Sequence, residues 1–321
     1  MTRFFDPLAT DARIHVAGHR GLVGSALWRL LLSRGHTSLI GRTSTELDLR
    51  NREAVFDFYR ETRPEYIVLA AAKVGGILAN STYPADFLSD NLQVQVNVLD
   101  AAAALGVRRV LFLGSSCIYP KLAAQPIAEE ALLTGPLEPT NDAYAIAKIA
   151  GILQVQALRR QHGCSFISAM PTNLYGPNDN FDLQTSHVLA AMLRKFHDAK
   201  VEGRDEVQLW GTGSARREFL HVDDLAHACV HLLEHYDEAA PINVGTGVDV
   251  SIRELATTVA DVVGYPGQVS WDASKPDGTA RKLLDIQRLR ELGWQPRISL
   301  RPGLASTYDW YTRRAASLAV A

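Results

Sequence analysis

Short apolar runs alternate with longer segments in which apolar residues recur every three or four positions. Each short run is apolar enough to be covered on both of its faces. We therefore predict strands at 14–17, 38–41, 66–70, 109–114 and 165–170. The segments between them predict helices at 21–33, 51–63, 86–105 and 142–161. This alternation predicts an α/β fold built on a doubly wound parallel sheet, the Rossmann arrangement.

The pattern loosens after Met170, where turn-forming residues interrupt the regular alternation. A helix is predicted to end near His197, a strand edge followed by a helix to span 218–236, and a short strand to span 242–244. We expect a Rossmann domain over 12–172, with 218–245 returning to it. A smaller mixed α/β domain, expected to bind the substrate, takes the remaining segments, 173–217 and 246–321.

The composition excludes several classes of protein. Of the 321 residues, 47% are hydrophobic and 21% are charged, which is ordinary for a chain with a sizeable core. The 33 Lys and Arg residues nearly balance the 35 Asp and Glu residues, and the net charge is −2. No basic excess is therefore present to bind nucleic acid or an anionic membrane, and a small-molecule partner is expected.

The cellular compartment is predicted from the cysteines and from the first residues. Three cysteines are too few and too scattered for a disulfide framework or a CxxC metal site. The first residues also lack the apolar stretch of a signal peptide. We expect a cytoplasmic protein.

A glycine-rich turn follows the first predicted strand and opens the first predicted helix. Glycines spaced GxxGxxG let the chain turn tightly, let backbone amides approach a pyrophosphate and let the helix pack on the strand. The helix N-terminus adds partial positive charge for the phosphates. The turn therefore predicts a dinucleotide site at Gly18, His19, Arg20, Gly21, Leu22, Val23 and Gly24.

The end of the second predicted strand indicates which dinucleotide binds. An NAD enzyme usually carries an acid there for the ribose hydroxyl, whereas this chain carries Arg42, with Arg20 already in the glycine turn. Two guanidinium groups suit the 2′-phosphate of NADP, so we expect NADP(H) as the cofactor. Glu46 and Asp48 offer an alternative acid, and Asp48 equally suits a contact with adenine or the cap of the helix from Asn51.

Tyr144 and Lys148 are four residues apart in a predicted helix, so their side chains share one face. A free tyrosine has a pKa of about 10 and exchanges a proton at neutral pH only if a nearby cation favours its ionised form. Ser115 follows the fourth predicted strand at the carboxyl edge of the sheet, where doubly wound folds bind ligands. Its hydroxyl is suited to orient a carbonyl group. By itself, the YxxxK spacing also fits an ordinary amphipathic helix.

The glycine turn, the serine after a strand and the YxxxK spacing occur in the order typical of the short-chain dehydrogenase/reductase superfamily, which this chain resembles. Further segments resemble its extended branch, which acts on nucleotide sugars, and within it the GDP-L-fucose synthase family, also called GDP-4-keto-6-deoxy-D-mannose 3,5-epimerase/4-reductase. The matching segments are 17–25 (AGHRGLVGS), 69–77 (LAAAKVGGI), 112–121 (FLGSSCIYPK), 138–141 (EPTN), 171–177 (PTNLYGP) and 217–224 (REFLHVDD). The resemblance covers nearly the whole chain.

The resemblance implies a two-stage reaction on GDP-4-keto-6-deoxy-D-mannose, namely epimerisation at C3 and C5 and then hydride transfer from NADPH to C4. Ser115, Tyr144 and Lys148 fall on the family's reductase triad, and Cys117 and His187 fall on its epimerase base and acid. The chemistry is coherent, because hydrogen bonds to the C4 oxygen acidify the neighbouring C–H groups and later favour hydride addition to the same carbonyl.

The resemblance also implies binding residues, position by position. Beyond the glycine turn and Arg42, the family's cofactor contacts fall on Asp48, Leu49, Leu113, Gly114, Ser115, Ser116, Lys148, Pro171, Thr172, Asn173 and Leu174. Its substrate contacts fall on His187, Lys195, Trp210, Arg217 and Asp277. One position departs from the pattern: some members carry an arginine two positions after Arg42, where this chain has Ser44. The phosphate clamp would then rest on Arg20 and Arg42.

For single positions, the residues alone are also compatible with a purely structural role. Cys117 also suits a small buried apolar position, and His187 an ordinary place at the start of a helix. Three other histidines share one helix face at a spacing that could hold a metal, namely His227, His231 and His235. No carboxylate or thiolate completes that set in the sequence, so no metal is expected.

The sequence also bears on two other functions and on one assembly. A nucleotide-sugar dehydratase would need an acid beside Ser115, where Ser116 and Cys117 offer none. A regulatory protein would bind NADP without chemistry, although such relatives usually lose the tyrosine or the lysine. The resemblance implies that the apolar helices over 86–105 and 142–161 pair across a two-fold axis, so we expect a homodimer. Helices buried within a monomer would show the same apolar pattern.

Overall fold

The computed structural model describes residues 7–275 and 277–319 and contains a six-stranded parallel sheet. Its strands lie in the order β2-β1-β3-β4-β5-β9. Their bounds are Leu39–Ile40, Ile14–Ala17, Tyr66–Leu69, Arg109–Leu113, Ser165–Pro171 and Ile242–Val244, in that order. The predicted doubly wound Rossmann fold is confirmed.

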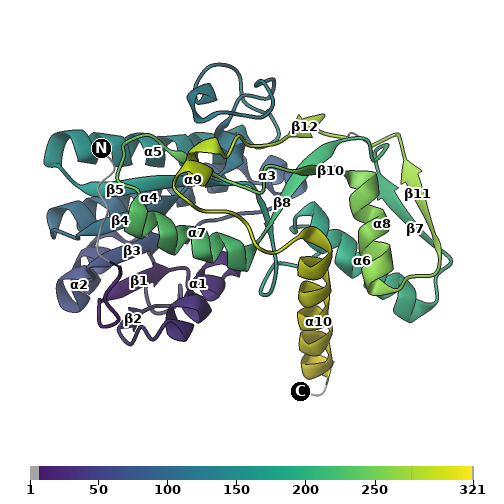
Figure 1. The fold of residues 1–321 in the computed structure, drawn as a ribbon, viewed down its shortest axis with the longest axis horizontal. Helices are drawn as coiled ribbons and strands as arrows, with labels where there is room; N and C mark the ends of the chain where they lie inside the picture. The colour runs from purple at the N-terminus through teal and green to yellow at the C-terminus, as the bar shows by residue number, and fades with distance from the viewer. Residues whose placement is uncertain (1–6, 276, 320–321) are drawn as a thin grey trace.

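Helices cover both faces of this sheet (Figure 1). They are α1 (Leu22–Ser33), α2 (Arg52–Thr62), α4 (Pro84–Ala104), α5 (Asp142–His162) and α7 (Val222–His235), while the short helix α3 (Ile77–Thr82) contacts α4. Because side chains alternate along a strand, β4 places Leu111 in one apolar core with α1 and α7, and Phe112 in the other core with α2, α4 and α5. Short 3-10 turns follow β4 at Ser116–Ile118 and Glu129–Ala131.

A second group of elements lies beside the Rossmann unit (Figure 1). Its strands are β6 (Asn173–Tyr175), β7 (Glu206–Trp210), β8 (Arg216–His221), β10 (Asp249–Ser251), β11 (Gln268–Asp272) and β12 (Arg281–Lys282). Its helices are α6 (Val188–Glu202), α8 (Ile252–Val263) and α10 (Leu300–Ala319), while α9 (Gln287–Glu291) packs near β9. Strand β8 pairs with β6, β10 and β12, so it holds this group together.

Some predicted boundaries are wrong by a few residues. The helix predicted to end near His197 is α6, which continues to Glu202, because Phe196 and Ala199 are buried in a core shared with α8 and Gly203 ends the helix with a φ of 68°. The second strand is shorter than 38–41 and keeps only Leu39–Ile40. The segment 218–236 is the end of β8 followed by α7.

The described residues contain no helix that is both long and apolar enough to cross a bilayer.

Candidate active site

The glycine turn lies at the carboxyl end of β1, as the sequence predicts. Gly18 has a φ of 83°, in the left-handed region that glycine adopts without strain. A Cβ on Gly24 would lie 2.1 Å from the Gly18 carbonyl oxygen, so only glycine lets α1 approach the turn this closely. The first turn of α1 holds no acidic residue, and its free amide groups suit a phosphate group.

The two predicted phosphate-binding arginines lie close together at the neighbouring edge of the sheet. Both guanidinium charges help to hold the pKa of Glu46 low, after the hydrogen bonds that its carboxylate accepts from Thr43. Arg42 also lies over the Phe58 ring, at 5.5 Å from its centroid. Arg20 and Arg42 are both exposed, so their charges are available to an anionic ligand.

The alternative that Asp48 caps the helix beginning after Asn51 is wrong. Asn51 itself accepts the capping hydrogen bond from the Ala54 amide at 3.1 Å. Asp48 instead forms an ion pair with Arg50 at 2.9 Å, and this hydrogen-bonded partner lowers the pKa of the Asp48 carboxyl. Its carboxylate is therefore engaged at the rim of the predicted cofactor site.

Ser115 and Tyr144 meet where β4 ends and α5 begins. Ser115 is extended and accepts a hydrogen bond from the Cys117 amide at 3.3 Å, which starts the 3-10 turn. The Ser115 hydroxyl lies near the Tyr144 phenol and acts to lower the pKa of that phenol. Burial, with a smaller contribution from the nearby Cys117, raises the pKa of Tyr144, so this phenol needs a cation to ionise near neutral pH.

Lys148 lies one helical turn after Tyr144 and is almost fully buried. Its ammonium donates a hydrogen bond to the Leu113 carbonyl at 2.8 Å and lies 5.9 Å from the centroid of the Tyr144 ring. Burial lowers the pKa of Lys148 to about 8. The side chain is therefore still mostly protonated at neutral pH, and its charge faces the tyrosine.

Cys117 is half-buried and has two nitrogen donors beside its sulfur. The Asn141 side-chain amide donates to Sγ at 3.3 Å, and Nζ of Lys282 lies 3.9 Å from Sγ. Neither residue is among the predicted site residues, although Asn141 ends the matching segment 138–141. Asn141 precedes Tyr144 by three residues, a signal that could have been noticed, whereas Lys282 is 165 positions from Cys117 and has no local signal.

Arg217 connects the cysteine with the predicted substrate contacts. Burial lowers the pKa of the Arg217 guanidinium, while the charges of Cys117, Glu138 and Asp277 act in the opposite direction. Such electrostatic effects require these groups to lie near one another. The structure therefore brings Arg217 and Asp277 to the side of the molecule that carries Cys117.

His187 is the N-cap residue of α6, and its side chain is exposed to solvent. Neighbouring protein atoms still desolvate the ring in part, and this lowers the pKa of its imidazole. The neutral ring is therefore the main form at neutral pH. The backbone just before it is held by a hydrogen bond from the Gly76 amide to the Thr185 carbonyl at 2.9 Å.

The remaining predicted substrate contacts differ in their surroundings. Lys195 is half-buried on α6, and burial lowers its pKa. Trp210 is 61% exposed at the end of β7, with the Lys275 ammonium 5.8 Å from its ring centroid. Asp277 accepts hydrogen bonds from the Thr212 amide at 2.7 Å and from the Thr212 hydroxyl at 2.8 Å, so it also holds the loop after Trp210.

The three histidines that share one face of α7 all contact other groups of the protein. His227 contacts Arg34, His231 contacts the Leu292 carbonyl, and His235 contacts the His231 carbonyl. Within 7–275 and 277–319, no group of three potential ligands is placed to hold a metal ion.

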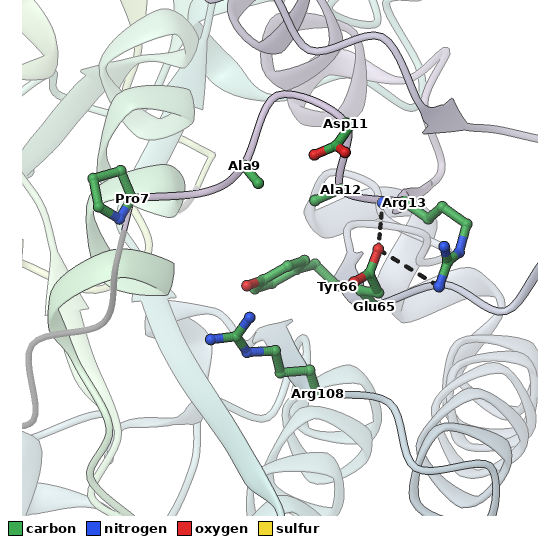
Figure 2. Close-up of a pocket in the computed structure, with 8 residues that line it drawn as sticks. All are labelled: Pro7, Ala9, Asp11, Ala12, Arg13, Glu65, Tyr66 and Arg108. Atoms are coloured by element: carbon green, nitrogen blue, oxygen red, sulfur yellow. Dashed lines mark hydrogen bonds and ion pairs between the residues drawn. The ribbon is translucent and has the colours of Figure 1, made fainter.

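A separate cavity lies at the amino edge of the sheet, away from the strand ends that carry the predicted site. Figure 2 shows Glu65 of this cavity pointing toward Arg13, with Arg108 beside Tyr66. It is lined by Pro7, Ala9, Asp11, Ala12, Arg13, Glu65, Tyr66 and Arg108. It contains none of the predicted site residues.

Comparison with known proteins supports the resemblance seen in the sequence. A model described as NAD dependent epimerase/dehydratase family matches residues 14–245. GDP-L-fucose synthase 1 of Arabidopsis thaliana is 60% identical over 303 residues, which cover 94% of each chain. GDP-L-fucose synthase of Escherichia coli (strain K12) is 56% identical over 308 residues. These residues cover 93% of this chain and 96% of the E. coli chain.

Solved structures agree in fold. A GDP-L-fucose synthetase from Naegleria fowleri bound to NADP superposes with a TM-score of 0.92 at 28% identity, covering 98% of this chain and 97% of the other. A GDP-6-OMe-4-keto-L-xylo-heptose reductase from C. jejuni gives a TM-score of 0.92 at 36% identity, covering 96% of this chain and 100% of the other. The predicted family resemblance is confirmed.

Proposed function

The chain belongs to the NAD dependent epimerase/dehydratase family, and we propose that it is an NADPH-dependent GDP-L-fucose synthase. It epimerises GDP-4-keto-6-deoxy-D-mannose at C3 and C5 and then reduces C4 to give GDP-L-fucose. The observation that carries this proposal is the grouping of Ser115, Tyr144 and Lys148 with Cys117 at the end of β4. Relatives named for this activity align over nearly the whole chain.

Ser115 and Tyr144 are proposed to hold the C4 carbonyl oxygen between two hydroxyl groups. The closeness of the two hydroxyl groups supports this role, because one carbonyl oxygen can then accept hydrogen bonds from both. Lys148 supplies a positive charge beside the phenol, which favours loss of the Tyr144 proton to the C4 oxygen during reduction. All three groups therefore stabilise negative charge as it develops on that oxygen.

Cys117 and His187 are proposed to carry out the epimerisation. The Cys117 thiolate removes a proton from the carbon beside the ketone, and the electron pair moves to the C4 oxygen. The His187 imidazole takes a proton from solvent and gives it to the opposite face of the same carbon, and solvent then removes the proton from Cys117. The position of Cys117 two residues after Ser115 supports this role, because base and carbonyl donor share one short turn.

The cofactor is proposed to bind along the glycine turn, with its 2′-phosphate between Arg20 and Arg42. When bound, NADPH supplies the hydride that reduces C4. The absence of acidic residues from the first turn of α1 and the closeness of the two arginines support this fit. The contacts proposed at Leu49, Gly114, Ser116 and 171–174 lie at or after the ends of neighbouring strands.

The nucleotide sugar is proposed to lie against the second group of elements. Arg217 and Lys195 would neutralise the diphosphate, Trp210 offers an exposed ring, and Asp277 holds the loop beside it. We accordingly propose that 12–172 with 218–245 binds the cofactor. The segments 173–217 and 246–321 would then bind the substrate.

A homodimer in the cytoplasm is proposed as the working form. Helices α4 and α5 pack side by side and expose Val96, Ile146 and Leu153. Ile146 and Leu153 are seven residues apart and share one helix face, so an apolar surface remains for a second copy. Cys117, Cys164 and Cys229 are all free thiols, which suits a reducing compartment.

The decisive experiment measures the loss of nicotinamide absorbance when the protein meets NADPH and GDP-4-keto-6-deoxymannose, with NADH and a UDP-keto-sugar as comparisons. Oxidation of NADPH together with a fucose-configured product is expected. Tight binding of NADPH without turnover on any keto-sugar would instead indicate a regulatory protein. Turnover of only the UDP-sugar would retain the mechanism and reject the substrate.

A further inference from the structure

The sulfur of Cys117 lies at a meeting point of three elements. The sulfur itself is in the 3-10 turn after β4, Asn141 belongs to the N-terminus of α5, and Lys282 belongs to β12. Asn141 donates a hydrogen bond to Sγ at 3.3 Å, and Nζ of Lys282 lies 3.9 Å away. Two donors, one of them a full positive charge, therefore face a single sulfur atom.

The backbone around Lys282 is held on both sides. Its neighbour Arg281 forms an ion pair with Asp249. On the other side, the Leu283 amide donates to the Gln125 side chain at 2.8 Å and the Leu284 amide donates to Glu218 at 3.1 Å. The position of Lys282 relative to Cys117 therefore follows from the fold, and does not depend only on one flexible side chain.

Strand pairing brings a second cation to the same place. Lys282 lies opposite Arg217 in the parallel register of β12 and β8, and the Arg217 guanidinium interacts electrostatically with Cys117. Cysteines that act as bases or nucleophiles occupy such electropositive, partly exposed surroundings, because positive charge favours the thiolate over the thiol. Cys164 and Cys229 have no such lysine contact among the described residues.

We propose that Lys282 is a positioning residue that stabilises negative charge on the Cys117 sulfur for proton removal beside the ketone. This inference rests on the proposed function, which makes Cys117 the epimerase base. The ammonium keeps its own proton and contributes charge, while Asn141 directs a lone pair of the sulfur. When the thiolate accepts the carbon-bound proton, the S–H bond forms, the C–H bond breaks and the electron pair moves to the C4 oxygen.

The test is the rate at which iodoacetamide alkylates Cys117 as a function of pH, followed by mass spectrometry of the cysteine peptides. Because iodoacetamide reacts with the thiolate, we expect Lys282→Met to slow alkylation of Cys117 about tenfold at pH 7. Lys282→Arg, which keeps the charge, should recover most of the rate. Cys164 in the same samples is the internal reference and should react equally in every variant.

Lys200→Met is the matched control, because Lys200 donates to the Val263 carbonyl on a distant pair of helices. An unchanged alkylation profile for Cys117 in Lys282→Met would overturn the inference, even if that variant lost activity, since Lys282 would then serve the substrate and not the thiol. The measurement needs no sugar and no NADPH. Failure of the proposed substrate assignment is therefore distinguishable from failure of this inference.

Discussion

The amide of Gly76 donates a hydrogen bond to the carbonyl of Thr185 at 2.9 Å, and so joins the loop after β3 to the segment that leads into His187. A Cβ on Gly76 would lie only 2.6 Å from the Ser186 carbonyl oxygen. The Asn80 side chain holds the same loop by donating to the Gly75 and Gly76 carbonyls at 2.7 and 3.0 Å. A Rossmann loop therefore sets the backbone position of the proposed epimerase acid.

Gly76→Ala should displace the 185–187 segment, because the atom it meets is backbone and cannot rotate away. We expect proton exchange at C3 and C5 to fall about 10²-fold, since small displacements of a catalytic group have effects of this size. Deuterium incorporation from solvent measures it. Gly163→Ala is the control: Gly163 has a φ of 67° and nothing within 4 Å of the added Cβ, so only about 1 kcal/mol of stability should be lost. An equal loss of exchange in both variants would contradict the positioning role.

Cys117→Ala should keep NADPH binding and lose proton exchange at C3 and C5, by about 10²- to 10⁴-fold. The reason is that the Ser115 and Tyr144 hydroxyls remain while the proton acceptor is gone. Exchange without NADPH and cofactor binding by fluorescence measure the two properties. Loss of cofactor binding together with exchange would argue against the proposed role.

Tyr144→Phe should show the opposite bias, with hydride transfer reduced far more than exchange. In the proposed mechanism only Tyr144 protonates the C4 oxygen, whereas Ser115 still donates a hydrogen bond to that oxygen during exchange. Single-turnover NADPH oxidation and deuterium incorporation should be compared in the same preparation. Equal losses of both activities in this variant and in Cys117→Ala would show that the division of roles is wrong.

Arg42→Ala should lower kcat/KM for NADPH by about 10- to 100-fold and leave kcat/KM for NADH nearly unchanged. The 2′-phosphate would lose one charge-assisted hydrogen-bonding partner, and NADH lacks that phosphate. Arg34→Ala, which removes an arginine that contacts His227 on the α7 side, should change neither value. Parallel losses with both cofactors in Arg42→Ala would contradict NADP selection by this residue.

Lys148 should make the stability of the cofactor-free protein rise with pH between about 8 and 10.5. Its pKa is lowered by burial from 10.5 to about 8 in the folded state, so the unfolded chain binds more protons in that window. Below pH 8 the buried charge of Lys148 lowers the free energy of unfolding by about 3 kcal/mol relative to its value above pH 10.5. Urea unfolding across the window should show a smaller rise for Lys148→Met, and identical slopes in both proteins would refute this.

Replacing both Ile146 and Leu153 with Arg should convert the proposed dimer into monomers. The two side chains are 47% and 43% exposed on α5, and an interface would have to bury two unpaired charges. Light scattering after size-exclusion chromatography measures the mass. Val201→Arg, at a 70% exposed position on α6, should leave the mass unchanged. A wild-type protein that is already monomeric at micromolar concentration would reject the dimer.

Much of the fold could be predicted because its determinants are local. The apolar runs at 14–17 and 66–69 and the glycine turn between the first strand and helix identify themselves within a few residues. The Tyr144 and Lys148 pair could also be read directly, because helical spacing places side chains four residues apart on one face. The exact extents of β2 and α6 could not, since pairing with β1 limits the first and packing of Phe196 and Ala199 against α8 extends the second.

The sequence by itself determined the Rossmann alternation, the glycine turn and the chemical types of the proposed site residues, because each depends on neighbours within one turn or strand. Only the tertiary structure decided that Lys282 meets Cys117 and that Gly76 holds Thr185. These pairs lie 165 and 109 positions apart (282 − 117 and 185 − 76). Contacts over such separations arise only when packing of the sheet and the second group of elements brings their backbones together, and no local pattern encodes them.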